Sequence, residues 1–280
     1  MISIEQLKAH IRNKSRSFNV NPNIILRNVI FDFFLEKLGK SKYTDKFIIK
    51  GGFLVSAITR IDARTTMDLD VTIKNLSIQK EKLTIYLNEI LRIPTHDNLV
   101  MNLTGVEEIN EGFEYPGLRA SITVHIDGLK EIMKIDFTTG DIVTPNEICF
   151  KYQTLLDEKF IELRSYNIET VIAEKIETIL SRGILNTRMR DFYDIYILKQ
   201  LKLPIIHMDI LRKAFMNTAS NRKTLDMILL NYRDIITMIE NDEGMKKHWK
   251  SYQSSYPFAK DLEWLVVIES VKSIFSYMST

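Results

Sequence analysis

The sequence is poor in the residues that build disulfide frameworks and soft-metal sites. It has a single cysteine, Cys149, and five histidines without metal-ligand spacing. A lone cysteine cannot form a disulfide within the chain, and a cysteine-rich zinc site is excluded as well. The chain also lacks a Gly-x-Ser-x-Gly motif and a Cys/His arrangement, which leaves hydrolases of those types without support.

Long apolar runs and an excess of charge of one sign are also missing. No stretch approaches about 20 uninterrupted apolar residues, so we expect no transmembrane helix. The N-terminal residues, which include Glu5, do not resemble a signal peptide. A cytoplasmic protein without a membrane partner is expected. The 38 Lys and Arg residues nearly balance 36 Asp and Glu residues, so the net charge of +2 offers no argument for nucleic-acid binding.

The remaining composition is that of an ordinary folded chain, with 45% hydrophobic and 26% charged residues in 280. Apolar periodicity and Gly or Pro breaks predict, in order, helices at 3–14 and 22–38, a strand at 47–50, a helix at 52–61, a strand at 69–73 and a helix at 77–91. Short extended segments follow, and Asp127-Gly128 predicts the turn of an antiparallel hairpin.

From about residue 150 the pattern is helical to the end of the chain. The fold class expected is therefore α/β, a mixed sheet with helices followed by an all-helical C-terminal domain. We expect a first domain at residues 1–148 and a helical domain at 149–280. An interface between them would be a natural place for a cleft.

Two glycines and two carboxylates are the most informative residues of the first domain. Gly51 and Gly52 follow a short apolar run, where glycine lets a backbone approach phosphate closely and a helix N-terminus offers N–H donors. Asp68 and Asp70 are spaced to project from one face of a strand. Two convergent carboxylates suit a hard cation and the phosphates it carries. The alternatives are a tight turn for the glycines and, for the Asp pair, a turn or helix cap followed by a strand.

Asp136 is a third candidate carboxylate. It lies in a predicted strand, where alternation would place an apolar residue on the face of Ile132. A carboxylate buried there without a partner would be costly, and a metal shared with Asp68 and Asp70 would be one partner. The alternative is an Asp on an edge strand that faces water.

The predicted helix at 168–182 carries a cation on its apolar stripe. Lys175 falls near the centre of that stripe, and Arg182 lies on nearly the same line. Asp191 and Asp194, which follow in the next helix, could pair with either cation and hold it in place. The alternatives are a snorkelling lysine and, for Asp191, a carboxylate favoured by the helix dipole.

Other basic residues are less specific. Arg64 lies close to the Asp pair and could hold phosphates, although a surface salt bridge is the more common use of an arginine. The basic and aromatic segment 246–250, near the C-terminus, could touch nucleic acid, but a solvated helix face is favoured.

Taken in order, these motifs resemble the AbiEii/AbiGii type of nucleotidyltransferase toxins, found in type IV toxin–antitoxin and abortive-infection systems. The resemblance covers about residues 20–200. It is carried by Lys50-Gly51-Gly52, the segment 64–70, Lys134-Ile135-Asp136-Phe137 with Gly140-Asp141, the segment 172–177, and the segment 186–195. One departure is Arg190, because these toxins usually have Lys before the following Asp.

The resemblance implies a polymerase-β-like nucleotidyltransferase core. By it, Asp68 and Asp70 bind divalent metal, Gly51 and Gly52 shape the nucleotide-phosphate turn, Lys175 contacts phosphate, and Asp191 is the acid of the fourth motif. Asp136 matches the third carboxylate of the wider superfamily. Thr66 occupies a hydroxyl position near the nucleotide that some relatives use for regulatory phosphorylation. Arg64 and Arg182 would help Lys175 to neutralise the triphosphate.

The activity so implied is transfer of a nucleotidyl group from an NTP to RNA, with Mg²⁺ or Mn²⁺ as cofactor. The acceptor by resemblance is a tRNA 3′ end, because some relatives modify tRNA. The partner is a cognate antitoxin of the repressor type. Two alternatives stay open: a nucleotide-binding regulatory protein without catalysis, and a metal-dependent phosphodiesterase that uses the same carboxylates.

Overall fold

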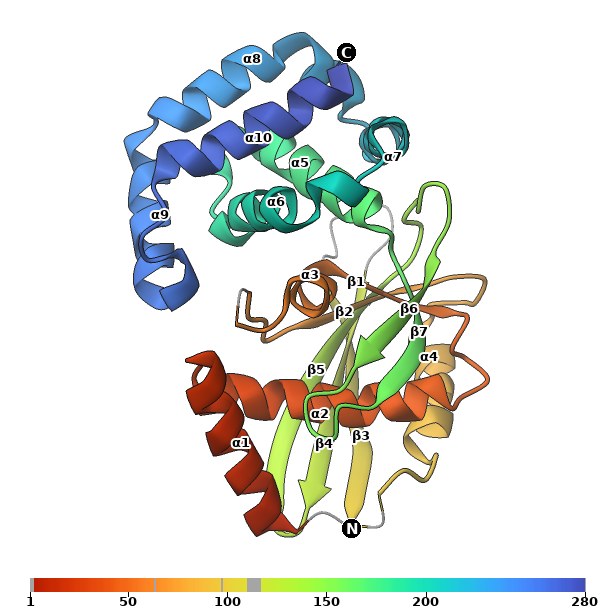
Figure 1. The fold of residues 1–280 in the computed structure, drawn as a ribbon. Helices are drawn as coiled ribbons and strands as arrows, with labels where there is room; N and C mark the ends of the chain where they lie inside the picture. Colours follow the sequence, from red (N-terminus) through yellow and green to blue (C-terminus); the bar gives the residue numbers. More distant parts are fainter. Residues whose placement is uncertain (1–2, 63, 97, 110–116, 280) are drawn as a thin grey trace. The chain divides into compact units, whose positions relative to one another are not determined.

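The computed structural model describes residues 3–279 except residues 63, 97 and 110–116. Across those residues it contains ten α-helices, three short 3-10 helices and one seven-stranded sheet (Figure 1). The chain divides into two compact units: residues 1–140 with 147–166, and residues 141–146 with 167–280. The expected class, a mixed sheet with helices followed by a helical region, is confirmed.

The first unit holds the whole sheet. Its elements are α1 (Ile4–Phe18), α2 (Pro22–Gly39), β1 (Phe47–Lys50), α3 (Gly51–Thr59), β2 (Leu69–Ile73), α4 (Lys80–Leu91), β3 (Leu99–Ile109), β4 (Gly117–Ile126), β5 (Leu129–Thr138), β6 (Ile148–Gln153) and β7 (Phe160–Ser165). The strand order is β3-β4-β5-β2-β1-β7-β6. Strand β1 pairs antiparallel with β2 and parallel with β7, and β2 pairs parallel with β5.

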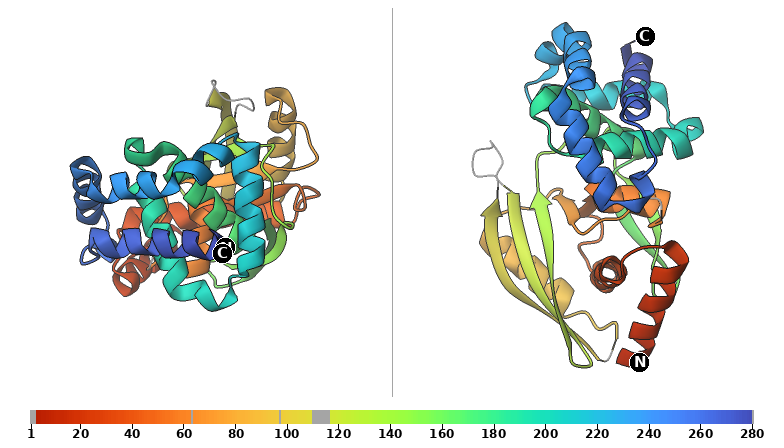
Figure 2. Two further views of the ribbon diagram at one scale, coloured as in Figure 1. Left: turned by 90° about the horizontal axis from the view of Figure 1, so that it is seen from above. Right: turned by 90° about the vertical axis from the view of Figure 1, so that its left-hand side faces the viewer.

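The core of this unit comes from one face of the sheet and from the helices on it. Phe47 and Phe137, on β1 and β5, are fully buried and meet edge to face, with ring centroids 5.7 Å apart. Helix α2 packs against β5 and β7, and α4 against β3. In the right-hand view of Figure 2, α2 lies next to the strands and α1 lies outside it. Such burial of large apolar side chains is the main source of stability.

The predicted hairpin forms β4 and β5, with Asp127 and Gly128 in its turn, both at positive φ. The expectation that Asp136 shares an apolar face with Ile132 is wrong. The buried residues of β5 are the odd-numbered ones from Met133 to Phe137, and Ile132 is 49% exposed. A strand has a period of two, so an error of one residue exchanges its faces. Asp136 therefore lies on the open face.

The expected domain boundary at residue 148 also differs from the structure. Residues 148–153 and 160–165 form β6 and β7, so the first unit extends to Tyr166. The two strands are only six residues long, and the polar residues between their apolar ones hid them inside a pattern that otherwise predicts helices. They complete the sheet because β7 pairs with β1.

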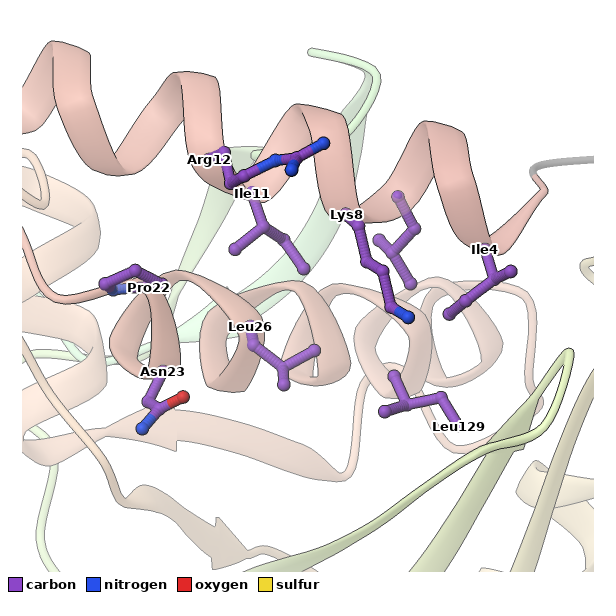
Figure 3. A pocket seen from close by; sticks show the side chains of 9 residues that line it. Ile4, Lys8, Ile11, Arg12, Pro22, Asn23, Leu26 and Leu129 are labelled. Carbon is purple, nitrogen blue, oxygen red and sulfur yellow. The ribbon is translucent and has the colours of Figure 1, made fainter.

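Helices α1 and α2 enclose an apolar groove of about 280 Å³ (Figure 3). Its apolar lining includes Ile4, Ile11 and Leu26, and Lys8 and Arg12 of α1 also line it. Helix α1 begins with a capping box in which Ser3 and Gln6 satisfy each other's backbone N–H groups. This groove is separate from the residues that the sequence singled out.

All regular secondary structure in the described residues of the second unit is helical. It contains α5 (Ile168–Arg182), η1 (Gly183–Leu185), α6 (Met189–Lys202), η2 (Leu203–Ile205), α7 (Met208–Asn221), α8 (Leu225–Asn241), α9 (Glu243–Ser255), η3 (Pro257–Ala259) and α10 (Trp264–Ser279). Helix α5 packs against α6, α7 and α8, and α10 packs against the same three. None of the described helices is both long enough and apolar enough to span a bilayer.

The segment 141–146 belongs to this helical unit through hydrogen bonds around Thr144. Its carbonyl accepts from Asn167 Nδ2 at 2.6 Å, its N–H donates to Thr170 Oγ1 at 3.1 Å, and its hydroxyl accepts from Asn217 Nδ2 at 2.9 Å. Asn167 is also the N-cap of α5 and accepts from the Thr170 N–H. The start of α5 is therefore fixed by buried polar contacts.

Candidate functional site

The glycine turn and the second carboxylate of the Asp pair are in direct contact. Gly51 opens α3 directly after β1 and has a φ of +63°. A Cβ atom at Gly51 would collide with Oδ2 of Asp70 and lie 2.8 Å from its Cγ. The carboxylate thus packs on the backbone of the turn, where only glycine leaves room and adopts this φ without strain. The structure brings together the two motifs that the sequence predicted to cooperate.

Gly52 is constrained in a similar way by Arg64 and Thr66. A Cβ atom at Gly52 would lie 2.8 Å from Arg64 Nη2 and 3.2 Å from Thr66 Oγ1. Arg64 is only 3% exposed and donates to the carbonyl of Thr65, while Ser56 donates to the Arg64 carbonyl at 2.6 Å. Arg64 is therefore a buried side chain that packs against the glycine turn at Gly52. Its contact with phosphate stays a prediction.

Thr66 shapes the loop that carries the first carboxylate. Its hydroxyl accepts from the Asp68 N–H at 3.3 Å and donates to the Asp68 carbonyl at 3.1 Å. The Thr66 carbonyl accepts from Nδ2 of Asn28 at 3.3 Å. Asn28 is buried in α2 among mostly apolar residues, and its polarity there was the signal for a role that sequence reasoning did not assign. The side chain of Asp68 is exposed, and Asp70 is partly buried.

Four charged residues lie in register across four adjacent strands. Lys50 of β1 pairs with Asp70 of β2, Asp70 with Asp136 of β5, and Asp136 with Arg119 of β4. Residues paired in this way point to the same face of a sheet. The open face therefore carries two carboxylates flanked by two cations. Lys50 Nζ also donates to Thr138 Oγ1 at 2.7 Å.

Arg119 holds the predicted third carboxylate. Its Nε and Nη2 donate to the two oxygens of Asp136 at 2.7 and 2.8 Å, a bidentate ion pair. The hydrogen bonds to Asp136 raise the pKa of the Arg119 guanidinium, and the charge of Asp68 acts in the same direction. Sequence reasoning missed Arg119, although its position opposite Asp136 in the predicted hairpin was a usable signal.

The carboxylates fit a hard cation that arrives with phosphates. No group of three or more His, Cys, Asp or Glu residues in the described part of the chain could hold a metal ion by itself. Mg²⁺ needs fewer protein ligands, because it is usually bound by one or two carboxylates together with substrate phosphates and water. Asp70 supplies one carboxylate beside the glycine turn, and the exposed Asp68 lies two residues before it in the chain. A metal role for either residue stays a prediction.

The second unit carries a separate group of buried charges. Lys175 Nζ lies 2.9 Å from Asp191 Oδ1 and 2.7 Å from Asp194 Oδ2. Both carboxylates are at most 1% exposed, and Arg188 Nε lies 2.8 Å from Asp191 Oδ2. The predicted pairing of Lys175 with these carboxylates is confirmed. Arg182, at the exposed end of α5, takes no part in this group.

This group joins the middle of α5 to the first turns of α6. A buried carboxylate is stable only when it is paired, so the ion pairs of Lys175 with Asp191 and Asp194 fix the relative position of the two helices. Asp191 also lies in the first turn of α6, where the helix dipole favours a negative charge. Both explanations offered for Asp191 by the sequence therefore hold together. The nucleotide contact predicted for Lys175 is untested by this geometry.

Comparison with known proteins bears on the family. The sequence profile of the nucleotidyl transferase AbiEii toxin, type IV toxin–antitoxin system, matches residues 34–275. A solved structure from H. pylori, described as a nucleotidyltransferase, is 13% identical with a TM-score of 0.49, and covers 93% of this chain and 98% of that one. JHP933 from Helicobacter pylori is 14% identical with a TM-score of 0.45, and covers 91% and 90%.

No protein of curated function matches the sequence. The family match is sufficient because it spans most of the chain, from within α2 to within α10, and includes both groups of charged residues. Membership of a type IV toxin–antitoxin family implies an antitoxin partner. The chain belongs to the AbiEii family of type IV toxin–antitoxin systems and is a nucleotidyltransferase.

Proposed function

We propose that this toxin transfers a nucleotidyl group from an NTP to an RNA acceptor, a tRNA 3′ end, in a Mg²⁺-dependent reaction in the cytoplasm. One observation carries the proposal: the carboxylate of Asp70 packs on the Gly51 backbone at the start of α3. A helix N-terminus and a glycine turn suit a phosphate, and a neighbouring carboxylate suits the cation bound to it.

In this proposal, each candidate residue of the first unit has a part in the reaction. Gly51 and Gly52 leave room for the side chains of Asp70 and Arg64 beside the start of α3, where the triphosphate would bind, and Thr66 holds the Asp68 loop in place. Asp68 and Asp70 would bind Mg²⁺ or Mn²⁺, which supplies charge neutralisation of the triphosphate and lowers the pKa of the acceptor hydroxyl. Asp136 would join them through its remaining lone pairs, since Arg119 occupies one acceptor site on each of its two oxygens.

The reaction balances as a substitution at phosphorus. The acceptor hydroxyl oxygen forms a bond to the α-phosphorus of the NTP, the bond from that phosphorus to the bridging oxygen breaks, and pyrophosphate leaves with the electron pair. The hydroxyl proton passes to solvent or a carboxylate. Lys175 is proposed to contact the triphosphate, with Asp191 and Asp194 fixing its ammonium. The exposed Arg182 can add a second cation.

The test is transfer of labelled nucleotide to RNA by purified protein with each NTP in turn. Asp68→Ala should abolish transfer, while the melting temperature changes little because Asp68 is exposed. The matched control is Asp261→Ala, which removes an exposed carboxylate of the helical unit. Transfer by Asp68→Ala at the wild-type rate would falsify the assignment.

The same assay separates the two alternatives. A metal-dependent phosphodiesterase would shorten RNA without added NTP, whereas a transferase lengthens RNA and needs NTP. A regulatory protein without catalysis would bind NTP but release no pyrophosphate. Chelation with EDTA should stop transfer, and Mg²⁺ or Mn²⁺ should restore it. Activity that survives chelation would contradict the metal requirement.

A further inference from the structure

The α6–α9 cavity, of about 380 Å³, lies in the helical unit. We define it by its lining: Thr187, Arg188, Met189, Arg190, His248, Ser251, Tyr252, Ser255 and Tyr256. Helices α6 and α9 contact each other, and Figure 1 shows them as neighbours. This volume is within the range of pockets that hold small ligands.

The lining combines two arginines and a histidine with two tyrosine rings, and it contains no carboxylate. Arg190 and His248 are exposed, and the Arg188 side chain is 41% exposed. Tyr252 and Tyr256 are partly exposed, with ring centroids 4.6 Å apart. Guanidinium groups recognise phosphate, and tyrosine faces stack on unpaired bases. A cavity with both features suits a nucleotide whose base is not paired.

The tyrosines rest on a rigid aromatic support. Tyr252 stacks on Trp249, and Tyr256 stacks on Phe258; in each pair the ring centroids are 5.4 Å apart. Trp249 is buried and donates from Nε1 to the Leu262 carbonyl at 2.9 Å. The basic and aromatic segment 246–250 is therefore divided: its tryptophan is core, and its histidine lines the cavity.

Arg188 connects this cavity to the buried charges of α5 and α6. The same guanidinium that lines the cavity has its Nε 2.8 Å from Asp191 Oδ2. A phosphate bound to Arg188 would therefore lie close to the charges that join α5 to α6. The cavity and this buried group share one guanidinium.

We infer that the α6–α9 cavity binds an unpaired nucleotide of the acceptor RNA, with its base against Tyr252 and Tyr256 and its phosphate on Arg188 and Arg190. The inference rests on the proposed transfer to RNA. A free NTP has the same chemistry, a base and phosphates, and the experiment distinguishes these two sources.

The test measures binding of a labelled RNA with an unpaired 3′ end by fluorescence anisotropy, without metal or NTP. Arg190→Glu and Tyr256→Ala should each raise the Kd at least about tenfold, since stacking and phosphate contacts are each worth about that factor. Tyr256→Phe keeps the ring and should stay within about twofold. The matched control is Arg212→Ala, an exposed arginine of α7 outside the cavity, which should also stay within about twofold.

Two further readouts keep this inference apart from the proposed function. Asp68→Ala should lose transfer yet bind RNA normally, and Tyr256→Ala should raise the KM for RNA with little change in kcat. Unchanged RNA binding by both Arg190→Glu and Tyr256→Ala would overturn the inference, even with transfer intact. A loss of NTP affinity without a loss of RNA affinity would also overturn it, because the cavity would then hold the free nucleotide.

Discussion

At Gly51, the identity of single residues was enough to predict part of the site. Strand alternation and the conformational freedom of glycine predicted carboxylates near this glycine turn, and the structure shows Asp70 in contact with it. The partner of Asp136 did not follow, because the phase of β5 was misjudged by one residue. An arginine two strands from Asp70 carries no local signature, so only the register of β4 and β5 identifies Arg119.

Gly51→Ala should abolish transfer and destabilise the protein. The new Cβ would collide with the Asp70 carboxylate, and a φ of +63° costs about 1–2 kcal/mol for alanine. The matched control is Gly105→Ala in β3, where an added Cβ meets nothing within 4 Å. Urea unfolding and the transfer assay measure both effects. Equal results for the two variants would contradict the steric argument.

Asp32 should make stability fall as pH rises. It is buried on α2, accepts from the Tyr152 hydroxyl at 2.6 Å, and accepts from the Leu155 N–H at 2.7 Å. Burial raises the pKa of Asp32 to about 8, above the ordinary value of 3.8, although both hydrogen bonds act to lower it. Since the folded state then binds more protons than the unfolded state, its stability decreases between about pH 4 and pH 8.

Asp32→Asn should remove that decrease, because an amide does not titrate. Its Oδ1 can accept from the Leu155 N–H, and its Nδ2 can donate to the Tyr152 hydroxyl oxygen. The free energy of unfolding of the variant relative to wild type should rise with pH, by at most about 1.4 kcal/mol per pH unit. Urea unfolding at a series of pH values between 4 and 8 measures the slope. Parallel profiles for the two proteins would show that Asp32 is not the group responsible.

Among the elements, long periodic helices were predictable and short strands were not. The helix from 168 to 182 matches α5 at both ends, because its apolar stripe spans four turns and Asn167 caps it. Strands β6 and β7 were missed, since six residues with mixed polarity carry little periodic signal. Their identity as strands depends on pairing with each other and with β1, which is information from elsewhere in the chain.

Lys175→Met should lower the free energy of unfolding by about 3–5 kcal/mol, because it leaves Asp191 and Asp194 buried with one cation fewer. The matched control is Lys272→Met on α10, which also removes a lysine between two carboxylates, Glu240 and Glu269. Lys272 and both glutamates are at least partly exposed, so Lys272→Met should lower the free energy of unfolding by less than about 1 kcal/mol. Similar costs from urea unfolding would mean that the α5–α6 charges are not effectively buried.

At the scale of the whole molecule, the chain passes between its two units three times, after residues 140, 146 and 166. The sequence-based prediction placed a single boundary at residue 148, because it assumed that each domain is one continuous segment. Nothing local marks residues 141–146 as part of the helical unit. Their membership comes from Thr144 and its hydrogen bonds to residues on α5 and α7.

Two fragments test this division. Residues 1–166 should fold with a strand-containing circular dichroism spectrum, since all seven strands are present. Residues 1–148 should aggregate, because they lack β7 and so leave β1 unpaired along one edge. Gel filtration and urea unfolding distinguish the two outcomes. A monomeric, cooperatively folded 1–148 fragment would contradict the assignment of β6 and β7 to the first unit.

The place of β1 in the sheet has a consequence for synthesis on the ribosome. One neighbour, β2, follows within about 20 residues, but the other, β7, begins at Phe160, roughly 110 residues after Lys50. At a translation rate on the order of ten residues per second, the edge of β1 waits about ten seconds for its second partner. The sheet edge next to the glycine turn is therefore completed late, and the nascent chain passes through a period in which this edge is open to chaperones.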